Sequence, residues 1–176
     1  MSKAIFFLGI DPDYTNPGYA ITLGRDIIRV GIFKTGVSRS GITIDIPTDV
    51  QEFFSDCICG VEVPILGRTK IFANTRGGLQ GRAIGLAKCT LMAGFLISHI
   101  GNQCKQTYLI EPIEWNPRKR KKEIVHRELF MVYPNLRKLR ATRGNGINDD
   151  SIDAVLIAQA TQKRFQLNEG KRRMRR

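Results

Sequence analysis

The chain has 176 residues, 42% of them hydrophobic, and a formal net charge of +12 at pH 7. This length and apolar share indicate one globular domain with its own core and exclude an extended, disordered chain. A positive surplus of this size favours a polyanionic partner, nucleic acid before an acidic membrane, over the alternative of a merely soluble basic protein.

The cations are clustered rather than spread evenly. They form three blocks, which are Arg118, Lys119, Arg120, Lys121, Lys122 and Arg127; Arg137, Lys138, Arg140 and Arg143; and Lys171, Arg172, Arg173, Arg175 and Arg176. We expect the first two blocks to contact DNA phosphates, which give affinity without sequence information.

The first predicted elements are three strands. Residues 4–11 form an unbroken apolar run, which is typical of a strand buried on both faces. Two further apolar runs, 18–23 and 27–33, are separated by a short Gly-Arg-Asp turn and predict a hairpin. A stretch rich in Gly, Ser and Thr, 35–46, predicts a loop, and a Thr-Asp-Val-Gln capping box then predicts a short helix over 48–56.

The second half predicts a strand at 57–63, a long helix rich in Gly and Ala at 75–100, and another strand at 107–110. Two more helices follow at 118–133 and 149–165. The order of elements predicts an α/β fold with a mixed five-stranded sheet, three antiparallel strands followed by parallel ones, flanked by helices.

We expect one domain over residues 1–165 and a basic, disordered tail over 166–176. No apolar run reaches membrane-spanning length, because Gly94 interrupts the longest, Leu91–Ile97. The N-terminal sequence lacks a signal-peptide pattern, and the four cysteines are expected to be reduced, buried thiols. Together these features predict a cytoplasmic protein with no membrane partner.

Four carboxylates stand where they can converge. Asp11 and Glu62 end two core strands, while Asp150 and Asp153 share one helix face at i,i+3. Such acids repel one another unless cations lie between them, and their hard oxygens suit Mg²⁺, with Mn²⁺ as a substitute. The alternative, that first-turn acids only complement a helix dipole, explains Asp149 and Asp150 better than Asp153. In a basic protein this pattern predicts two-metal hydrolysis of phosphodiesters, with either Asp149 or Asp150 as the ligand.

Five motifs accompany these acids in order. They are Gly9-Ile-Asp-Pro12, Gly18-Tyr-Ala20, Val61-Glu62, Leu79-Gln-Gly-Arg-Ala-Ile-Gly-Leu-Ala87 and Asp150-Ser-Ile-Asp-Ala-Val-Leu-Ile-Ala158. Their sequences and spacing resemble those of the RuvC Holliday-junction resolvases, which have the RNase H-like fold. The resemblance implies a RuvC-type nuclease domain.

The resemblance also implies a Mg²⁺-dependent homodimer that binds four-way (Holliday) and other branched DNA and cuts it by paired nicks, in DNA recombination and repair. It implies that Asp11, Glu62, Asp150 and Asp153 are the catalytic metal ligands, and that Lys121 lies near the scissile phosphate. In the family the Gly/Ala-rich helix lies at the dimer interface, although packing against the sheet would explain its small residues equally well.

Some features depart from the family pattern. Asp13 stands where the family often has glycine. Phe72 is the candidate for the aromatic residue that opens the junction centre, and an ordinary surface or core residue is the alternative. The arginine-rich tail and the basic segment 137–143 resemble a phage or viral version of the family rather than the bacterial one.

The first hypothesis is therefore a crossover-junction endodeoxyribonuclease. The alternatives are an RNase H-like nuclease for flaps or RNA–DNA hybrids and a non-catalytic protein that binds branched DNA. Four intact carboxylates argue against the non-catalytic protein, because without metals they only weaken DNA affinity. A Gly-Ile-Asp start also occurs in actin-like ATPases and sugar kinases, which need two such domains and more than 176 residues.

Overall fold

The structure, a computed structural model, describes residues 4–38, 41–63, 78–117, 120–136 and 148–174. Its elements in chain order are β1 (Phe6–Asp11), β2 (Gly18–Leu23), β3 (Asp26–Ile32), β4 (Lys34–Ser38), β5 (Gly41–Asp45), α1 (Thr48–Gln51), the 3-10 turn η1 (Phe54–Asp56), β6 (Cys57–Glu62), α2 (Gly78–His99), the 3-10 turn η2 (Gly101–Gln103), β7 (Gln106–Ile110), α3 (Pro112–Trp115), α4 (Lys122–Val132) and α6 (Asp149–Met174).

The main sheet has five strands in the order β3-β2-β1-β6-β7. Strands β1, β2 and β3 are antiparallel neighbours, whereas β6 runs parallel to β1 and β7 parallel to β6. The predicted mixed sheet of antiparallel and then parallel strands is therefore confirmed. Strands β4 and β5 form a separate antiparallel pair within the stretch where the sequence predicts a loop.

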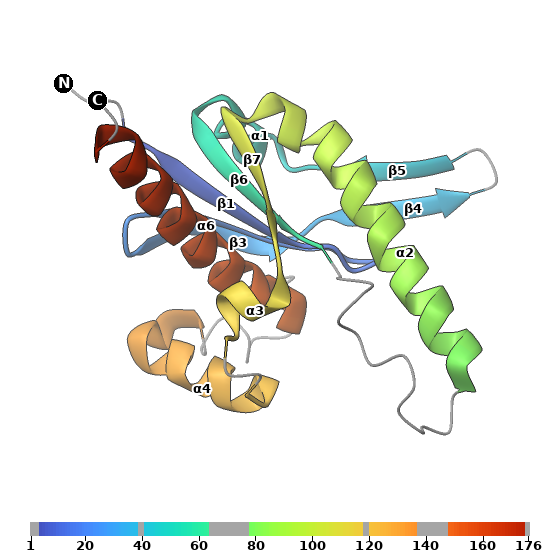
Figure 1. Ribbon diagram of the computed structural model, residues 1–176. Helices are drawn as coiled ribbons and strands as arrows, with labels where there is room; N and C mark the ends of the chain where they lie inside the picture. The colour runs from blue at the N-terminus through green and yellow to red at the C-terminus, as the bar shows by residue number, and fades with distance from the viewer. Residues whose placement is uncertain (1–3, 39–40, 64–77, 118–119, 137–147, 175–176) are drawn as a thin grey trace.

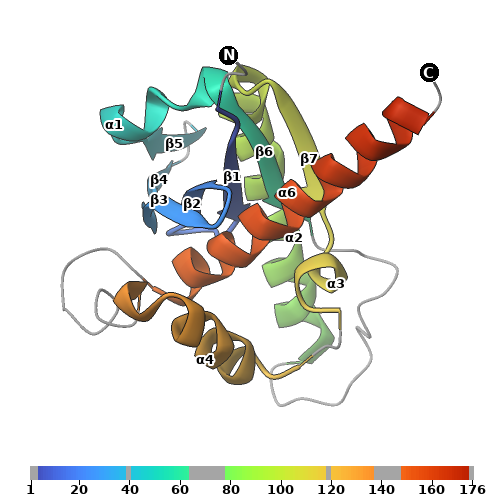
Figure 2. The same ribbon diagram turned by 90° about the vertical axis from the view of Figure 1, so that its left-hand side faces the viewer.

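Two long helices cover opposite faces of the sheet, as Figures 1 and 2 show. Successive residues of β1 point to opposite faces. Leu8 belongs to the core that also holds Met92 and Leu96 of α2, whereas Phe7 packs in a cluster with Ile157 of α6. Helices α3 and α4 lie at the end of the molecule where α6 begins (Figures 1 and 2).

Glycines let α6 lie unusually close to the sheet. A Cβ atom on Gly9 of β1 would overlap the backbone of Ala154 and Ala158 in α6. A Cβ atom on Gly18 of β2 would overlap the backbone at Asp150. These contacts bring the first turns of α6 directly onto the carboxyl end of β1, where the strand's aspartate lies.

Helix α6 is longer than the sequence predicts. The predicted disordered tail from residue 166 is corrected here, because the helix continues to Met174. Two tertiary contacts hold the helix where this extension starts: the Phe165 ring packs on Phe7 at 5.9 Å between centroids, and Asn168 Nδ2 donates a hydrogen bond to the Tyr108 hydroxyl at 3.4 Å.

Helix α2 is only partly covered by the rest of this chain. Leu96 is fully buried, but Ile84 and Leu91 are 50% and 58% exposed. By length and composition alone, Ile84–Gln103 is apolar enough to cross a membrane, and 28% of that window is buried. This differs from the sequence-based expectation, because Gly94 does not interrupt the helix. One such helix is weak support for a membrane span, since core helices of soluble proteins have the same composition.

Candidate active site

Two of the predicted acids are neighbours in the sheet. Ile10 of β1 pairs with Val61 of the parallel strand β6, so the next residues, Asp11 and Glu62, end adjacent strands at the same edge. Asp11 stands two residues after Gly9 and therefore on the face covered by α6. The sequence placed both acids at strand ends, and the parallel pairing explains why they meet.

The other two predicted acids come from the first turns of α6. Burial and, after it, the charges of Glu62, Asp153 and Asp150 together raise the pKa of Asp11 to about 8, against the opposing charge of Lys122. An effect from all three carboxylates requires them to lie near Asp11. The structure therefore brings the four predicted acids together, while their catalytic role stays a prediction.

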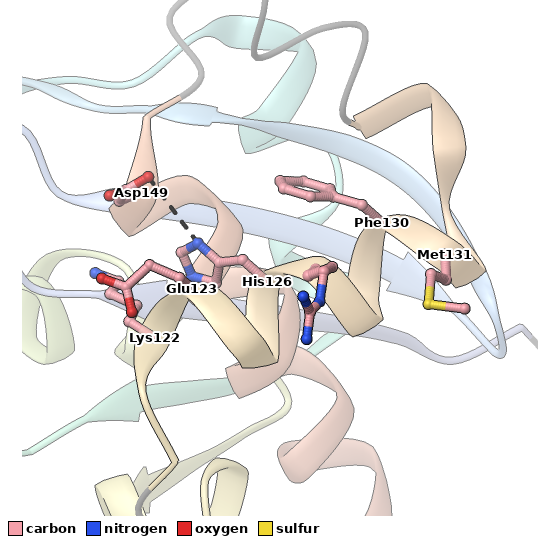
Figure 3. A pocket seen from close by; sticks show the side chains of 7 residues that line it. Lys122, Glu123, His126, Phe130, Met131 and Asp149 are labelled. Carbon is pink, nitrogen blue, oxygen red and sulfur yellow. Dashed lines mark ion pairs between the residues drawn. The ribbon is translucent and has the colours of Figure 1, made fainter.

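Asp149 and Asp150 point to different surroundings. Asp150 has one oxygen 3.8 Å from the Lys122 ammonium, and the other accepts a hydrogen bond from Asn148 Nδ2 at 2.9 Å. Asp149 instead faces His126 on α4, with 4.0 Å between Oδ1 and Nδ1 (Figure 3). Burial, which outweighs the opposing charge of Lys122, raises the pKa of Asp150. Asp150 is thus the better candidate ligand.

A lysine lies among the acids, and it is the residue after Lys121, the lysine that the family resemblance implies. Lys122 Nζ is 2.5 Å from Asp153 Oδ2. Burial alone would lower the pKa of Lys122, but its hydrogen bond to Asp153 and the surrounding negative charges raise the pKa overall. Lys121, which the family resemblance placed near the scissile phosphate, is the exposed N-cap residue of α4. Its role stays a prediction.

The proposed DNA contacts are only partly visible. Arg120 forms an ion pair with Glu128, 2.5 Å between Nη1 and Oε1, and Arg127 is exposed on α4. Apart from Lys121 and Lys122, described above, the other candidates lie outside the described residues, and they are Phe72, Arg118, Lys119, Arg137, Lys138, Arg140 and Arg143.

Two residues of the site have no signal in the sequence. Trp115 Nε1 donates a hydrogen bond to Glu62 Oε2 at 2.8 Å. His126 Nε2 lies 2.5 Å from Asp153 Oδ1, and both side chains are 4% exposed. A pocket of about 360 Å³ lies beside the His126 ring, and it is lined by His126, other residues of α4 and Asp149 (Figure 3).

The indole N–H of Trp115 should control the ionisation of Glu62. Burial outweighs the hydrogen bond from Trp115, which lowers the pKa of Glu62, and the pKa is raised overall to about 7. In Trp115→Phe the pKa of Glu62 therefore rises further, and less of the carboxylate is ionised at pH 7. For the nuclease that the sequence predicts, we expect about tenfold slower nicking at pH 7 and recovery toward pH 9, since such a bond contributes roughly 1.5–3 kcal/mol.

The measurement is the rate of DNA nicking as a function of pH. Tyr133→Phe is the control, because it removes a hydrogen bond to the carbonyl of Arg25, away from the acids. A Trp115→Phe profile that coincides with the wild-type profile would show that this bond does not tune Glu62.

The acids have the chemistry of a divalent-cation site. Within the described ranges, no three His, Cys, Asp or Glu side chains already stand in ligand geometry. The oxygens of Asp153 are occupied by Lys122 and His126 instead. Burial first, and then neighbouring carboxylates, raise the pKa values of Asp11 and Glu62. The Lys122 ammonium, 3.8 Å from Asp150 Oδ1, already occupies the cluster as a cation. Hard oxygen donors of this kind fit Mg²⁺ or Mn²⁺.

No protein-family model matches the chain, and no curated protein sequence matches it. Its structure is similar to that of T. thermophilus RuvC in complex with a Holliday junction substrate, with a TM-score of 0.51 and 15% sequence identity, over 92% of this chain and 96% of that chain. Another structure of Thermus thermophilus RuvC gives a TM-score of 0.46 and 16% identity, over 92% and 97% of the two chains. The first likeness, together with the mixed five-stranded sheet, shows that this chain has the RuvC-like form of the RNase H-like fold.

Proposed function

We propose that the chain is a Mg²⁺-dependent, structure-selective DNA endonuclease that resolves four-way junctions by paired nicks. The observation that carries the proposal is the convergence of Asp11, Glu62, Asp150 and Asp153 around one ammonium group, in a protein of net charge +12. The RuvC-like fold supports it, since the T. thermophilus RuvC was seen with a Holliday junction substrate.

Each group in the site would have a distinct role. The four carboxylates would hold the metal, with Asp11 and Glu62 on the sheet side and Asp150 and Asp153 on the helix side. Bound Mg²⁺ would activate a water molecule and stabilise the leaving oxygen of the phosphodiester. Lys122 would turn from Asp153 toward the substrate phosphate, since its side chain is 40% exposed and has a flexible four-carbon stem.

Branched DNA would be bound mainly through its phosphates. The cations of the first two basic blocks, within residues 118–127 and 137–143, would supply this affinity, which carries no sequence information. Structure selectivity would then come from the arrangement of two such surfaces in a dimer, because a C2 axis places two sites on two strands.

The exposed face of α2 is the proposed dimer surface. Ile84 and Leu91 are half-exposed there, and a second copy of the chain would cover them. We expect Leu91→Lys to weaken dimerisation by about 2 kcal/mol, roughly thirtyfold, because it places a charge in an apolar interface. Paired nicks would then become independent single nicks.

Sedimentation equilibrium and a supercoiled cruciform assay would measure these two effects. Leu167→Lys is a matched control, because Leu167 on α6 is also 58% exposed. If the Leu91→Lys protein remains dimeric and still makes paired nicks, α2 does not form the dimer interface.

The function itself is tested with purified protein on synthetic four-way, three-way, flap, RNA–DNA hybrid and linear substrates, each with Mg²⁺, Mn²⁺ or EDTA. We expect metal-dependent, symmetric nicks on the four-way substrate. Preference for flaps or hybrids would favour the alternative RNase H-like activity. Tight junction binding without any cleavage would favour a non-catalytic branched-DNA-binding protein.

A further inference from the structure

We infer that His126 is a positioning residue that fixes the orientation of the Asp153 carboxylate in the metal site. The inference rests on the proposed function. Its basis is the contact of 2.5 Å between His126 Nε2 and Asp153 Oδ1, in which both side chains are 4% exposed. Because an ionised carboxylate only accepts hydrogen bonds, the imidazole donates here through Nε2–H.

The two oxygens of Asp153 have different partners. Oδ1 faces the His126 ring, and Oδ2 faces the Lys122 ammonium. The lysine is 40% exposed on a flexible stem, whereas the imidazole is buried and rigid. When Lys122 moves toward DNA, His126 would still stop the carboxylate from rotating. Oδ2 would then remain turned toward the place that the Lys122 ammonium now occupies beside Asp150, where a cation would bind.

The imidazole is itself fixed by its surroundings. Nδ1 lies 4.0 Å from Asp149 Oδ1, and the ring meets Phe130 edge-on at 6.3 Å between centroids (Figure 3). Asp149 and Asp153 are one turn apart on α6, so the two ring nitrogens face two carboxylates of the same helix. This arrangement sets the register of α4 against α6 and, with it, the position of Lys122.

A residue that hydrogen-bonds to a metal-ligating carboxylate affects metal affinity rather than the stability of the fold, so its role can be measured. A hydrogen bond to a ligating carboxylate sets its direction and basicity, and loss of the partner typically lowers metal affinity or activity by about 10- to 100-fold. A histidine that only filled a buried space would affect the free energy of unfolding and leave metal affinity unchanged.

Two amide variants separate these roles. In His126→Gln the side-chain amide can place an N–H near the position of Nε2, whereas in His126→Asn it reaches only the position of Nδ1, toward Asp149. We expect His126→Asn to weaken Mn²⁺ binding by about 10- to 100-fold, measured by isothermal titration calorimetry without DNA, and to slow nicking in parallel. His126→Gln should restore most of both. Junction affinity in EDTA should be equal in all three proteins.

A second measurement leaves His126 in place, in case His126→Asn does not fold. The chain has two histidines, so a His99→Gln protein leaves His126 as the one ring to observe by ¹⁵N NMR. We expect Mg²⁺ to shift the Nε2 resonance while the Nε2-bound proton is retained.

Equal Mn²⁺ affinity in the wild type and His126→Asn, or an Nε2 resonance that Mg²⁺ does not move, would overturn the inference. Failure of the proposed function gives a different result, because the wild-type protein would then bind no divalent cation or would cut no DNA.

Discussion

We expect nicking of four-way DNA by the Asp11→Asn protein to fall about a thousandfold or more in Mg²⁺, while binding of the same DNA persists. Asp11 lies at the centre of the carboxylate cluster, where three other acids act on it. Removing a metal ligand loses several kcal/mol of transition-state stabilisation, and each 1.4 kcal/mol is about tenfold in rate. Phosphate contacts elsewhere on the protein do not depend on this carboxylate.

The measurements are single-turnover nicking and electrophoretic mobility shift on one labelled junction. Asp13→Asn is a matched control two residues along the chain. Asp13 Oδ1 caps the turn after β1 by accepting hydrogen bonds from the N–H groups of Thr15 and Asn16 at 2.9 and 3.0 Å. Asparagine keeps this acceptor, so nicking should be nearly unchanged. Mg²⁺-dependent cleavage retained by Asp11→Asn would contradict the assignment of the site.

The Asp11→Asn protein should also have a larger free energy of unfolding than the wild type when no metal is present. Burial first, and then the neighbouring carboxylates, raise the pKa of Asp11 from 3.8 to about 8. Between these values the folded chain keeps a proton that the unfolded chain releases, so the free energy of unfolding falls as pH rises. Asparagine does not titrate and avoids this loss.

We therefore expect Asp11→Asn to exceed the wild type by a few kcal/mol at pH 7 in EDTA, with a difference that shrinks toward pH 4. Urea unfolding at several pH values measures it, and added Mg²⁺ should narrow the gap by stabilising the wild type alone. If Asp11→Asn is less stable than the wild type at pH 7, burial and the neighbouring carboxylates do not destabilise the ionised form of Asp11.

Local patterns predicted the acids because each follows a strong local rule. Asp11 and Glu62 end apolar strands, and parallel neighbours bring such ends to one edge of a sheet. Asp150 and Asp153 share a helix face through their spacing alone. Gly9 has no side chain, and this leaves room for the backbone of α6 to lie directly on β1.

The remaining site residues depend on contacts that no local pattern encodes. Trp115 meets Glu62 from 53 positions away, and His126 meets Asp153 from 27 positions away. The family resemblance points to Lys121, whereas the lysine beside the acids is Lys122, and geometry explains this difference. Successive residues on a helix differ by about 100° in direction, so the site lysine follows from where α4 begins, and the sequence predicted that start at residue 118 rather than Lys122.

The close approach of α6 to β1 makes Gly9 the most sensitive position for both stability and activity. In Gly9→Ala the new methyl group would overlap the carbonyl oxygen of Ala154 and the backbone nitrogen of Ala158. These are backbone atoms of a long helix, so no side chain can turn away and α6 must move outward as a unit. We expect a loss of about 3 kcal/mol in the free energy of unfolding, or roughly 6–12 °C in Tm.

The displacement also reaches the chemistry, because Ala154 directly follows Asp153 in α6. An outward shift would separate Asp153 from Asp11. At temperatures below the unfolding transition, the nicking rate relative to the wild type should therefore fall well below the fraction of the protein that is folded. Gly170→Ala is the matched control on the same helix: no atom lies within 4 Å of its added methyl, so it should gain about 0.5–1 kcal/mol. Wild-type Tm and nicking in Gly9→Ala would mean that α6 does not bring its two aspartates to the sheet through this contact.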